Sequence, residues 1–255
     1  MSIDEKWTYT LNINGFKVEA QYYADDVERI FVPILKKITE IHEKNARRTF
    51  VFLASSPGMG KTTLATFFAM LSEQREDIHP IQSIGLDGFH RKRDYLLSHT
   101  MEIEGRSVIM NDVKGCPETF DIEKAAEKLH QLQTHKAVKW PLYDRVLHDV
   151  VEDQITVNGD IVLIEGNWLL LDEDHWRELV KFCDYRIFVR GSETLLEERL
   201  VKRKMMGGLS FEEARQFYFS SDRKNVLRAQ AKVLPADCVL ELQDNGHYTC
   251  GGKHE

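Results

Sequence analysis

One ten-residue segment constrains the fold of this 255-residue chain more than any other feature. The segment ASSPGMGKTT, residues 54–63, lies between the apolar stretch Phe50–Ala54 and a helical pattern that begins at Lys61. Glycines let a backbone bend around a phosphate and turn its N–H groups inward, and a following helix points the positive end of its dipole at the same anion. The order of strand, glycine loop and helix therefore predicts a phosphate-binding loop.

The residues of this loop have separate predicted roles. Lys61 is expected to reach the β- and γ-phosphates of a nucleotide, and the hydroxyl of Thr62 is expected to ligate Mg²⁺. The usual pattern has glycine where this chain has Ser55, and serine would cost on the order of 1 kcal/mol if that position required a positive φ. The alternative is a Gly/Pro turn that happens to precede Lys-Thr. The predicted nucleotide contacts are Ser56, Pro57, Gly58, Met59, Gly60, Lys61, Thr62 and Thr63.

Short apolar stretches alternate with longer helical patterns from Thr49 onward. This alternation predicts an α/β fold, in which a parallel sheet is covered by helices on both faces. The predicted strands are Phe50–Ala54, Ile81–Leu86, Ile161–Glu165, Tyr185–Val189 and Val239–Leu242. The predicted helices are Lys61–Glu73, Asp121–Gln133, Asp174–Phe182, Glu193–Met205 and Phe211–Asp222, the last of which begins with a capping box formed by Ser210 and Glu213.

Both ends of the chain are predicted to form hairpins. Residues 7–23 alternate in polarity around Asn14-Gly15, a dipeptide that favours a two-residue turn, and Asn245-Gly246 is the corresponding turn near the C-terminus. A helical pattern follows the first hairpin from about Asp26, and Pro33 inside it predicts either a kink or a later start of the helix. We therefore expect an N-terminal β-hairpin and helix extension, residues 1–48, before the main domain, residues 49–255. The sequence leaves open whether the two hairpins pair with each other.

Composition excludes several classes of function. The chain has 34 basic and 41 acidic residues, and a net charge of −7 argues against a nucleic-acid polymer as partner. The apolar runs fall far short of the roughly 18 residues that span a bilayer, and the first residues do not resemble a signal peptide. The four cysteines are scattered without metal-like spacing, so we expect thiols rather than disulfides. We expect a cytoplasmic protein without a membrane partner and leave a homodimer open.

A second motif, Asp87-Gly-Phe-His90, follows the second predicted strand. The carboxyl ends of parallel strands line the crevice in which ligands bind, so we expect Asp87 to face the phosphate-binding loop. A carboxylate there can take the proton from an attacking hydroxyl, and such general-base help is worth about 10²–10⁴ in rate. A turn-forming Asp-Gly pair is the alternative.

Five motifs appear in the order found in the superfamily of uridine kinases, phosphoribulokinases and bacterial pantothenate kinases. They are the phosphate-binding loop, DGFH (87–90), PETFD (117–121), PLYDRVLH (141–148) and EGNW (165–168). The chain most resembles a bacterial branch described as nucleoside/nucleotide kinase-like, which shares DGFH and PETFD. The resemblance covers about residues 49–242 and implies a P-loop NTPase-type sheet, ATP and Mg²⁺ as cofactors, and a small-molecule hydroxyl group as acceptor.

The resemblance also implies roles for single residues. Asp87 matches the catalytic base, and Glu165 matches the carboxylate that helps to organise Mg²⁺. Tyr143 and His148 match the YDxxxH pair that contacts the acceptor in uridine kinases. Asp222 and Asn225 resemble, weakly, a polar cluster near the nucleotide base.

The same resemblance implies a helical lid at residues 193–210. Arg199 and Arg203 lie four residues apart, on one face of the predicted helix, and the family places lid arginines over the ATP phosphates. Such an arginine is worth about 10³–10⁵ in rate. Ion pairs with Glu197 and Glu198 are the alternative.

Further candidates for acceptor contacts come from their place beside these motifs. Asn167 and Trp168 follow Glu165, although Trp168 is as well suited to the core. Lys114 and Arg145 could meet an anionic group of the acceptor or simply be solvated. His90 and His148 are almost equally well explained as structural histidines.

These residues together predict an ATP-dependent kinase that phosphorylates a hydroxyl group of a small metabolite. A nucleoside or sugar acceptor is favoured, because Tyr143, His148 and Asn167 offer hydrogen bonds rather than a charge clamp. A pantothenate-type kinase and a catalytically silent nucleotide-binding regulator of the same fold are the alternatives. Ser55 is the only support for the silent regulator.

Overall fold

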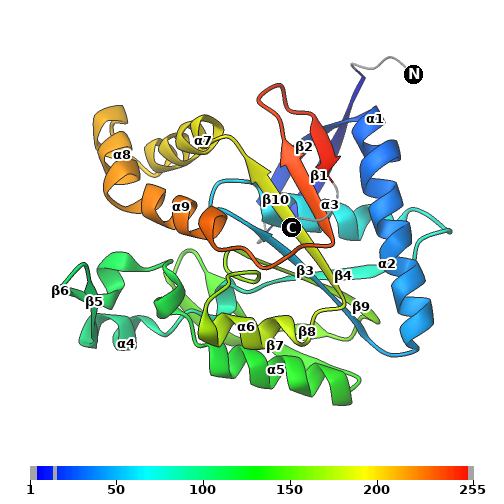
Figure 1. Cartoon of the computed structure of the whole chain (residues 1–255), viewed down its shortest axis with the longest axis horizontal. Helices are drawn as coiled ribbons and strands as arrows, with labels where there is room; N and C mark the ends of the chain where they lie inside the picture. The colour runs from blue at the N-terminus through cyan, green and yellow to red at the C-terminus, as the bar shows by residue number, and fades with distance from the viewer. Residues whose placement is uncertain (1–4, 14–15, 252–255) are drawn as a thin grey trace.

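The strand that precedes the phosphate-binding loop lies inside the main sheet (Figure 1). The computed structural model describes residues 5–13 and 16–251. Its six-stranded sheet has the order β12-β11-β10-β3-β9-β4, in which the first five strands by sequence run parallel and β12 antiparallel. The α/β fold is thus confirmed. The strands are β3 (Thr49–Ser55), β4 (Ile81–Gly85), β9 (Ile161–Gly166), β10 (Tyr185–Gly191), β11 (Cys238–Leu242) and β12 (Tyr248–Gly251).

Alternate residues of β3 enter two separate cores. Val51 and Leu53 belong to one buried cluster, whereas Phe50, Phe52 and Ala54 belong to the other, as the two-residue period of a strand requires. The first cluster is covered by α2 (Val32–Asn45), α3 (Lys61–Glu73), α7 (Glu193–Met206) and α8 (Phe211–Phe217). The second is covered mainly by α5 (Ile122–Thr134) and α6 (Asp174–Val180). Helices therefore cover both faces of the sheet, as predicted.

The five predicted strands and the five predicted helices are confirmed, with small differences at their ends. The segment predicted as one helix over Phe211–Asp222 consists of α8 and the π-helical turn η5 (Tyr218–Asp222), and α9 (Arg223–Ala231) then continues it. Ser210 and Glu213 form the predicted capping box at the start of α8. No helix in the described part of the chain is long and apolar enough to cross a membrane.

The N-terminal hairpin consists of β1 (Lys6–Ile13) and β2 (Phe16–Tyr23), which pair antiparallel. Its predicted turn, Asn14-Gly15, lies outside the described residues. A short α1 (Ala24–Asp26) and the π-helical turn η1 (Val27–Phe31) lead into α2. The π turn comes directly before Pro33, whose ring and missing N–H disturb the regular hydrogen-bond ladder. The ring of Tyr22 stacks on Phe67 of α3, with 4.3 Å between ring centroids, and holds the hairpin beside the phosphate-binding loop.

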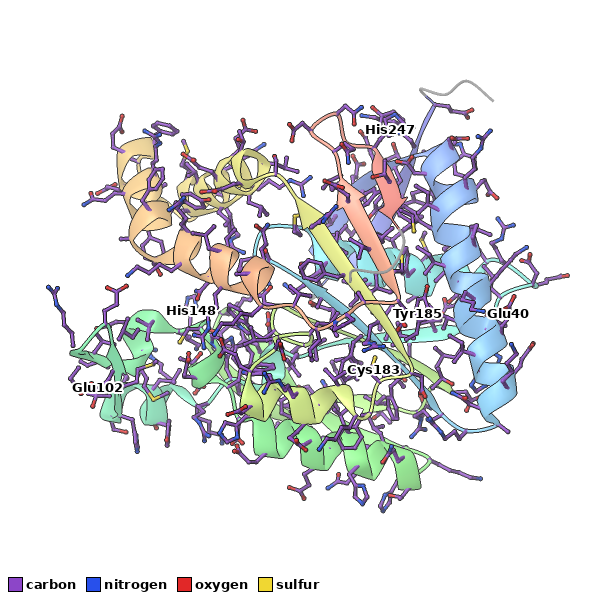
Figure 2. All side chains as sticks on the ribbon, viewed as in Figure 1. Glu40, Glu102, His148, Cys183, Tyr185 and His247 are labelled. Carbon is purple, nitrogen blue, oxygen red and sulfur yellow. The ribbon has the colours of Figure 1, made fainter. Side chains whose placement is uncertain are left out.

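The C-terminal hairpin is formed by β11 and β12, and its turn is longer than predicted. The N–H of Gln243 donates to the carbonyl of His247, so that Asp244 joins Asn245 and Gly246 in the turn. The two terminal hairpins belong to different sheets. They meet through side chains instead: His247 (labelled in Figure 2) stacks on Tyr23 at 3.4 Å and contacts Asp26 at 3.1 Å.

Two hairpins beside the main sheet had no counterpart in the sequence prediction. One is β5 (Thr100–Ile103) with β6 (Arg106–Ile109), preceded by α4 (Arg93–Ser98), and the other is β7 (Val138–Asp144) with β8 (Asp149–Val157). The second hairpin packs against the short 3₁₀ turn η2 (Asp87–Phe89). It therefore stands next to the DGFH motif.

Candidate active site

The phosphate-binding loop has the backbone that its glycines predict. Gly58 and Gly60 have φ angles of +87° and +83°, which L residues with a Cβ rarely adopt. A Cβ on Gly58 would lie 3.0 Å from Cγ of Leu200 in α7, so glycine also permits the close approach of the lid helix. Ser55 is instead the buried last residue of β3, and its φ is not positive. The strain considered for serine at this position is therefore absent.

Glu165 lies at the centre of a buried polar cluster at the end of β9. The hydroxyl of Thr62 donates to its Oε1 at 2.7 Å, and Nζ of Lys61 lies 3.7 Å from its Oε2. Burial raises the pKa of this carboxyl group, while Lys61 and the hydrogen bond from Thr62 oppose the shift. Within the described residues, Oε2 has no hydrogen-bond partner. A buried carboxylate beside a threonine hydroxyl is a donor set that fits Mg²⁺, so these residues suit the implied metal ion.

Asp87 is placed beside this cluster by the sheet. Gly85 of β4 pairs with Glu165 of β9, and the N–H of Leu86 donates to the carbonyl of Glu165 at 2.8 Å. Asp87 then begins η2, which packs against β7. A Cβ on Gly88 would lie 2.2 Å from the carbonyl oxygen of Pro141, so glycine is required for this contact. The DGFH motif thus packs closely against the hairpin formed by β7 and β8.

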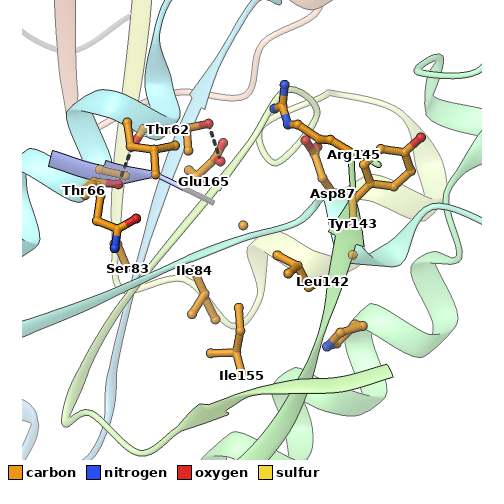
Figure 3. A pocket seen from close by; sticks show the side chains of 16 residues that line it. Thr62, Thr66, Ser83, Ile84, Asp87, Leu142, Tyr143, Arg145, Ile155 and Glu165 are labelled. Carbon is orange, nitrogen blue, oxygen red and sulfur yellow. Dashed lines mark hydrogen bonds between the residues drawn. The ribbon is translucent and has the colours of Figure 1, made fainter. Parts of the chain in front are cut away.

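Two cavities meet at Asp87. The first, of about 750 Å³, lies over the phosphate-binding loop and is called here the nucleotide-side cavity. The second, of about 420 Å³, lies between η2, α3 and β7 and is called the acceptor-side cavity (Figure 3). Both cavities are lined by Ile13, Thr62, Asp87 and Arg145.

Most of the predicted nucleotide contacts line the nucleotide-side cavity. They are Pro57, Gly58, Gly60, Lys61, Thr62 and Thr63. The side chains of Ser56 and Met59 are buried and do not line it, so a contact of these two residues through their backbone stays a prediction. Asp222 and Asn225 also line this cavity, in agreement with the weak motif match.

The lid arginines lie over the same cavity. Arg199 of α7 donates to the carbonyl oxygens of Met59 at 3.2 Å and Gly58 at 3.4 Å. Arg203, one turn later, lines the cavity and is exposed. Glu197, considered as an ion-pair partner, pairs with Arg215 of α8 at 3.0 Å instead. Within the described residues neither arginine forms an ion pair with a carboxylate, so both can face a bound anion.

Tyr143 and Arg145 line the acceptor-side cavity, as their motif predicted. The hydroxyl of Tyr143 accepts a hydrogen bond of 3.0 Å from Nζ of Lys114, a residue that lines the nucleotide-side cavity. Asn167 lines the same cavity as Lys114, and its buried Oδ1 has no hydrogen-bond partner among the described residues. The structure therefore brings these four predicted residues to the two cavities.

Three predicted acceptor contacts line neither cavity. Trp168 is fully buried and donates from its indole N–H to the carbonyl of Gly115 at 2.9 Å, so it belongs to the core. His148 lies in the exposed β7–β8 turn, where its carbonyl accepts a hydrogen bond from Lys114. His90 packs 3.9 Å from the ring of Phe120, and burial lowers its pKa to about 4 although Asp87 opposes the shift. His90 is therefore a neutral packing residue above that pH.

The structure adds several lining residues that sequence reasoning missed, two of them from β1. Asn12 and Ile13, at the end of β1, line the acceptor-side cavity. The N-terminal hairpin precedes all five motifs in the chain, so no motif could have pointed to them. Its packing on α3 is a tertiary contact between residues far apart in sequence.

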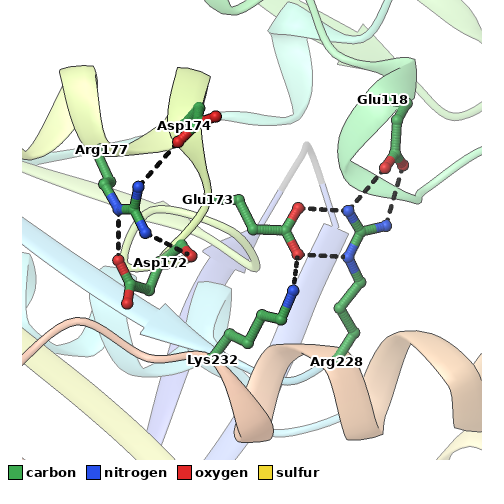
Figure 4. A network of polar contacts seen from close by, with 7 residues as sticks. All are labelled: Glu118, Asp172, Glu173, Asp174, Arg177, Arg228 and Lys232. Atoms are coloured by element: carbon green, nitrogen blue, oxygen red, sulfur yellow. Dashed lines mark hydrogen bonds and ion pairs between the residues drawn. The ribbon is translucent and has the colours of Figure 1, made fainter.

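An ion-pair network fastens α9 to the PETFD segment (Figure 4). Arg228 of α9 contacts Glu118 at 2.6 Å and also binds Glu173, which Lys232 contacts at 3.3 Å. Burial by itself lowers the pKa of Arg228, but its hydrogen bonds with both glutamates outweigh burial and raise it. Arg228 thus stays charged and joins α9 to the loops beside the second core.

Comparisons with known proteins agree with this geometry. A model of the phosphoribulokinase/uridine kinase family matches residues 50–227. The chain is 39 % identical over 239 residues to the uncharacterised protein YggC of Escherichia coli (strain K12), over 93 % of this chain and 97 % of that one. It is 28 % identical over 230 residues to a pantothenate kinase of Listeria welshimeri, over 82 % and 72 % of the two chains. Among solved structures, a "putative fructose transport system kinase" from Silicibacter sp. TM1040 is 30 % identical with a TM-score of 0.69, over 80 % of this chain and 98 % of that one.

Proposed function

The chain belongs to the phosphoribulokinase/uridine kinase family, and on this premise we propose that it transfers the γ-phosphoryl group of ATP to a hydroxyl group of a small metabolite. One observation carries the proposal: Asp87 lies where the nucleotide-side and acceptor-side cavities meet. A carboxylate at that junction can reach a hydroxyl in one cavity that attacks a phosphate held in the other. The acceptor-side cavity, at about 420 Å³, has the size of a small-ligand pocket.

Asp87 and the residues around it have different roles in the proposed phosphoryl transfer. Asp87 accepts the proton of the acceptor hydroxyl as that oxygen attacks. Lys61 and the N–H groups at the start of α3 hold the phosphates, and Arg199 and Arg203 cover them from the lid. Thr62 and Glu165 would hold Mg²⁺, which when bound neutralises charge on the phosphates. An acceptor hydroxyl must lose a proton whereas an acceptor phosphate need not, so Asp87 favours an alcohol over a nucleoside monophosphate.

We propose a nucleoside or sugar as the acceptor. The acceptor-side cavity combines polar groups of Asn12, Ser83 and Tyr143 with the apolar side chains of Ile84 and Leu142. This mixture suits a compact molecule with several hydroxyl groups. The similar structure from Silicibacter, a "putative fructose transport system kinase", supports a sugar.

A pantothenate-type acceptor is the second candidate, and Arg145 favours it. The guanidinium group of Arg145 lines both cavities and can pair with a carboxylate on the acceptor. The pantothenate kinase of Listeria welshimeri is among the relatives of this chain. Pantothenate therefore belongs in the same test.

The test is a measurement of acceptor-dependent ADP release with Mg²⁺ and ATP. Purified protein is offered uridine and other nucleosides, fructose and other ketoses, and pantothenate. Asp87→Asn should lower kcat by about 10²–10⁴-fold with little change in the KM for ATP. Asp94→Asn, which changes an exposed aspartate of α4 outside both cavities, is the matched control and should behave as wild type.

Lys61→Ala provides an independent arm of this test. It should abolish turnover while the far-ultraviolet circular dichroism stays that of wild type. If the wild type binds ATP tightly but releases ADP with none of these acceptors, a catalytically silent nucleotide-binding regulator replaces the kinase as the better explanation. Unchanged kinetics of Lys61→Ala would show that the phosphate-binding loop is misassigned.

A further inference from the structure

Two histidines and an aspartate meet at the end of the sheet opposite the phosphate-binding loop. His42 lies in the last turn of α2, His79 lies two residues before β4, and Asp160 directly precedes β9. The three residues precede the amino ends of the parallel strands β3, β4 and β9, whereas the phosphate-binding loop follows the carboxyl end of β3. The cluster and the loop therefore lie at opposite ends of the sheet. One ligand atom from each side chain lies within 4.8 Å of the other two.

The distances between these groups are close to those of a metal centre. Nε2 of His79 lies 3.7 Å from Oδ2 of Asp160, and the rings of His42 and His79 have centroids 4.5 Å apart. Ligand atoms about 2.0–2.2 Å from a tetrahedral Zn²⁺ lie about 3.3–3.6 Å from one another. The side chain of Asp160 is 70 % exposed, so it can rotate toward the two histidines without disturbing the core.

A buried threonine lies beside His42. Nδ1 of His42 lies 3.2 Å from Oγ1 of Thr49, and this hydroxyl can donate its own hydrogen to the carbonyl of Arg47 at 3.4 Å. In that arrangement the hydroxyl accepts the hydrogen on Nδ1. Nε2 of His42 is left with a free lone pair, which is the state that a metal ligand requires. A threonine hydroxyl in this place acts as an outer partner that orients a ligating histidine.

The positive side chains around the three residues are engaged elsewhere. Arg47 pairs with Asp184 at 2.6 Å, and Arg48 donates to backbone carbonyl groups, including that of Gly159 at 2.8 Å. Both arginines line the same hollow as His42, His79 and Asp160, together with Glu43. Glu43 and Asp160 therefore supply negative charge to a site whose neighbouring cations already have partners.

We propose that His42, His79 and Asp160 bind a divalent transition-metal ion such as Zn²⁺. Two neutral imidazoles and one carboxylate suit Zn²⁺ better than Mg²⁺, which prefers oxygen ligands throughout. Water would complete the coordination. The site joins α2, in the N-terminal extension, to the segments that enter β4 and β9. It is separate from the phosphate-binding loop and does not depend on the proposed kinase activity.

Titration of the full-length, chelator-treated protein with ZnCl₂ in a calorimeter, without nucleotide, tests the site. The wild type should bind one Zn²⁺ through it, and the ion should raise the Tm. His79→Ala and Asp160→Asn should each weaken binding at least tenfold. Asp160→Asn changes an exposed side chain, so it tests the site even if a histidine variant folds poorly. His130→Ala, at an exposed position of α5, is the matched control and should bind as wild type.

Thr49→Val separates a true centre from a chance cluster, because it leaves all three ligands in place. The loss of the outer partner should weaken Zn²⁺ binding by about 10–100-fold. Absence of Zn²⁺ binding at micromolar concentration would overturn the proposal and leave an ordinary His79–Asp160 ion pair. Equal binding by the wild type, His79→Ala and Asp160→Asn would overturn it as well, since the ion would then bind elsewhere.

Discussion

The hydroxyl of Thr62 donates a 2.7 Å hydrogen bond to Oε1 of Glu165 and so joins the first turn of α3 to the end of β9. The same two side chains are those proposed to hold Mg²⁺. In the absence of a cation, Glu165 is a buried carboxylate whose charge is opposed mainly by Lys61 and, to a smaller extent, by Arg145. The groups needed for ligand binding are thus held together before a ligand arrives. Burial of the Glu165 carboxylate lowers the stability of the folded protein in return.

Glu165→Gln should separate function from stability. Because burial raises the pKa of Glu165, its charged form is disfavoured in the folded protein. Relative to the variant, the wild type should therefore be equally stable at a pH below the ordinary glutamate pKa, about 4.3, and should become less stable as the pH rises from there through the raised value. The kcat of the variant should fall by at least about 10²-fold, because a metal ion supplies several kcal/mol to such a reaction.

Urea unfolding at pH 4 and pH 8, together with the ADP-release assay, checks this prediction. Glu73→Gln, at the exposed end of α3, is the control and should change neither quantity. A variant as active as the wild type would rule out Glu165 as a metal-organising group.

Ser55→Gly should not improve ATP binding, although it restores the usual motif. The φ of Ser55 is not positive, and the loop takes its positive φ angles from Gly58 and Gly60. Glycine within a strand costs about 0.5–1 kcal/mol through the added freedom of the unfolded chain. The expected result is an unchanged KM for ATP and a lower Tm; a clearly lower KM would mean that serine does impair the loop.

His90 should make the protein sensitive to acid. Its pKa is lowered to about 4 by burial, whereas an unfolded histidine has a pKa of about 6.5. Between these values the unfolded state binds more protons, so stability should fall by about 3 kcal/mol as the pH is lowered through this window, and should be unaffected above it. His90→Phe should remove this part of the pH dependence. His148→Phe, at an exposed position, should retain it, and identical pH profiles for the wild type and His90→Phe would contradict the assignment.

Trp168→Phe should affect stability and leave the choice of acceptor unchanged. The substitution removes the hydrogen bond to Gly115 and part of a fully buried ring, at a cost of about 1–3 kcal/mol. Trp176→Phe, in the same core but on α6, serves as the comparison for lost volume alone. If Trp168→Phe changed which acceptors are phosphorylated, the residue would belong to the acceptor site after all.

The sequence by itself determined the local parts of this protein. Its strand, glycine loop and helix around Lys61 were predictable because they depend on residues adjacent in the chain, and the apolar periods of the other main strands and helices are local in the same way. Asp87 and Glu165 were predictable as site residues because strands of a parallel sheet end at one edge. The family resemblance then supplied Tyr143 and the lid arginines.

Only the tertiary structure decided which side chains face the ligand cavities. Trp168 and His90 carry the right chemistry beside the right motifs, yet Trp168 packs in the core and His90 packs against Phe120, and no local pattern predicts these outcomes. Asn12 and Ile13 reach the acceptor-side cavity because Tyr22 stacks on Phe67, a contact between residues 45 positions apart. Burial and long-range packing depend on the whole folded chain, and for this reason they could not be read from any single segment.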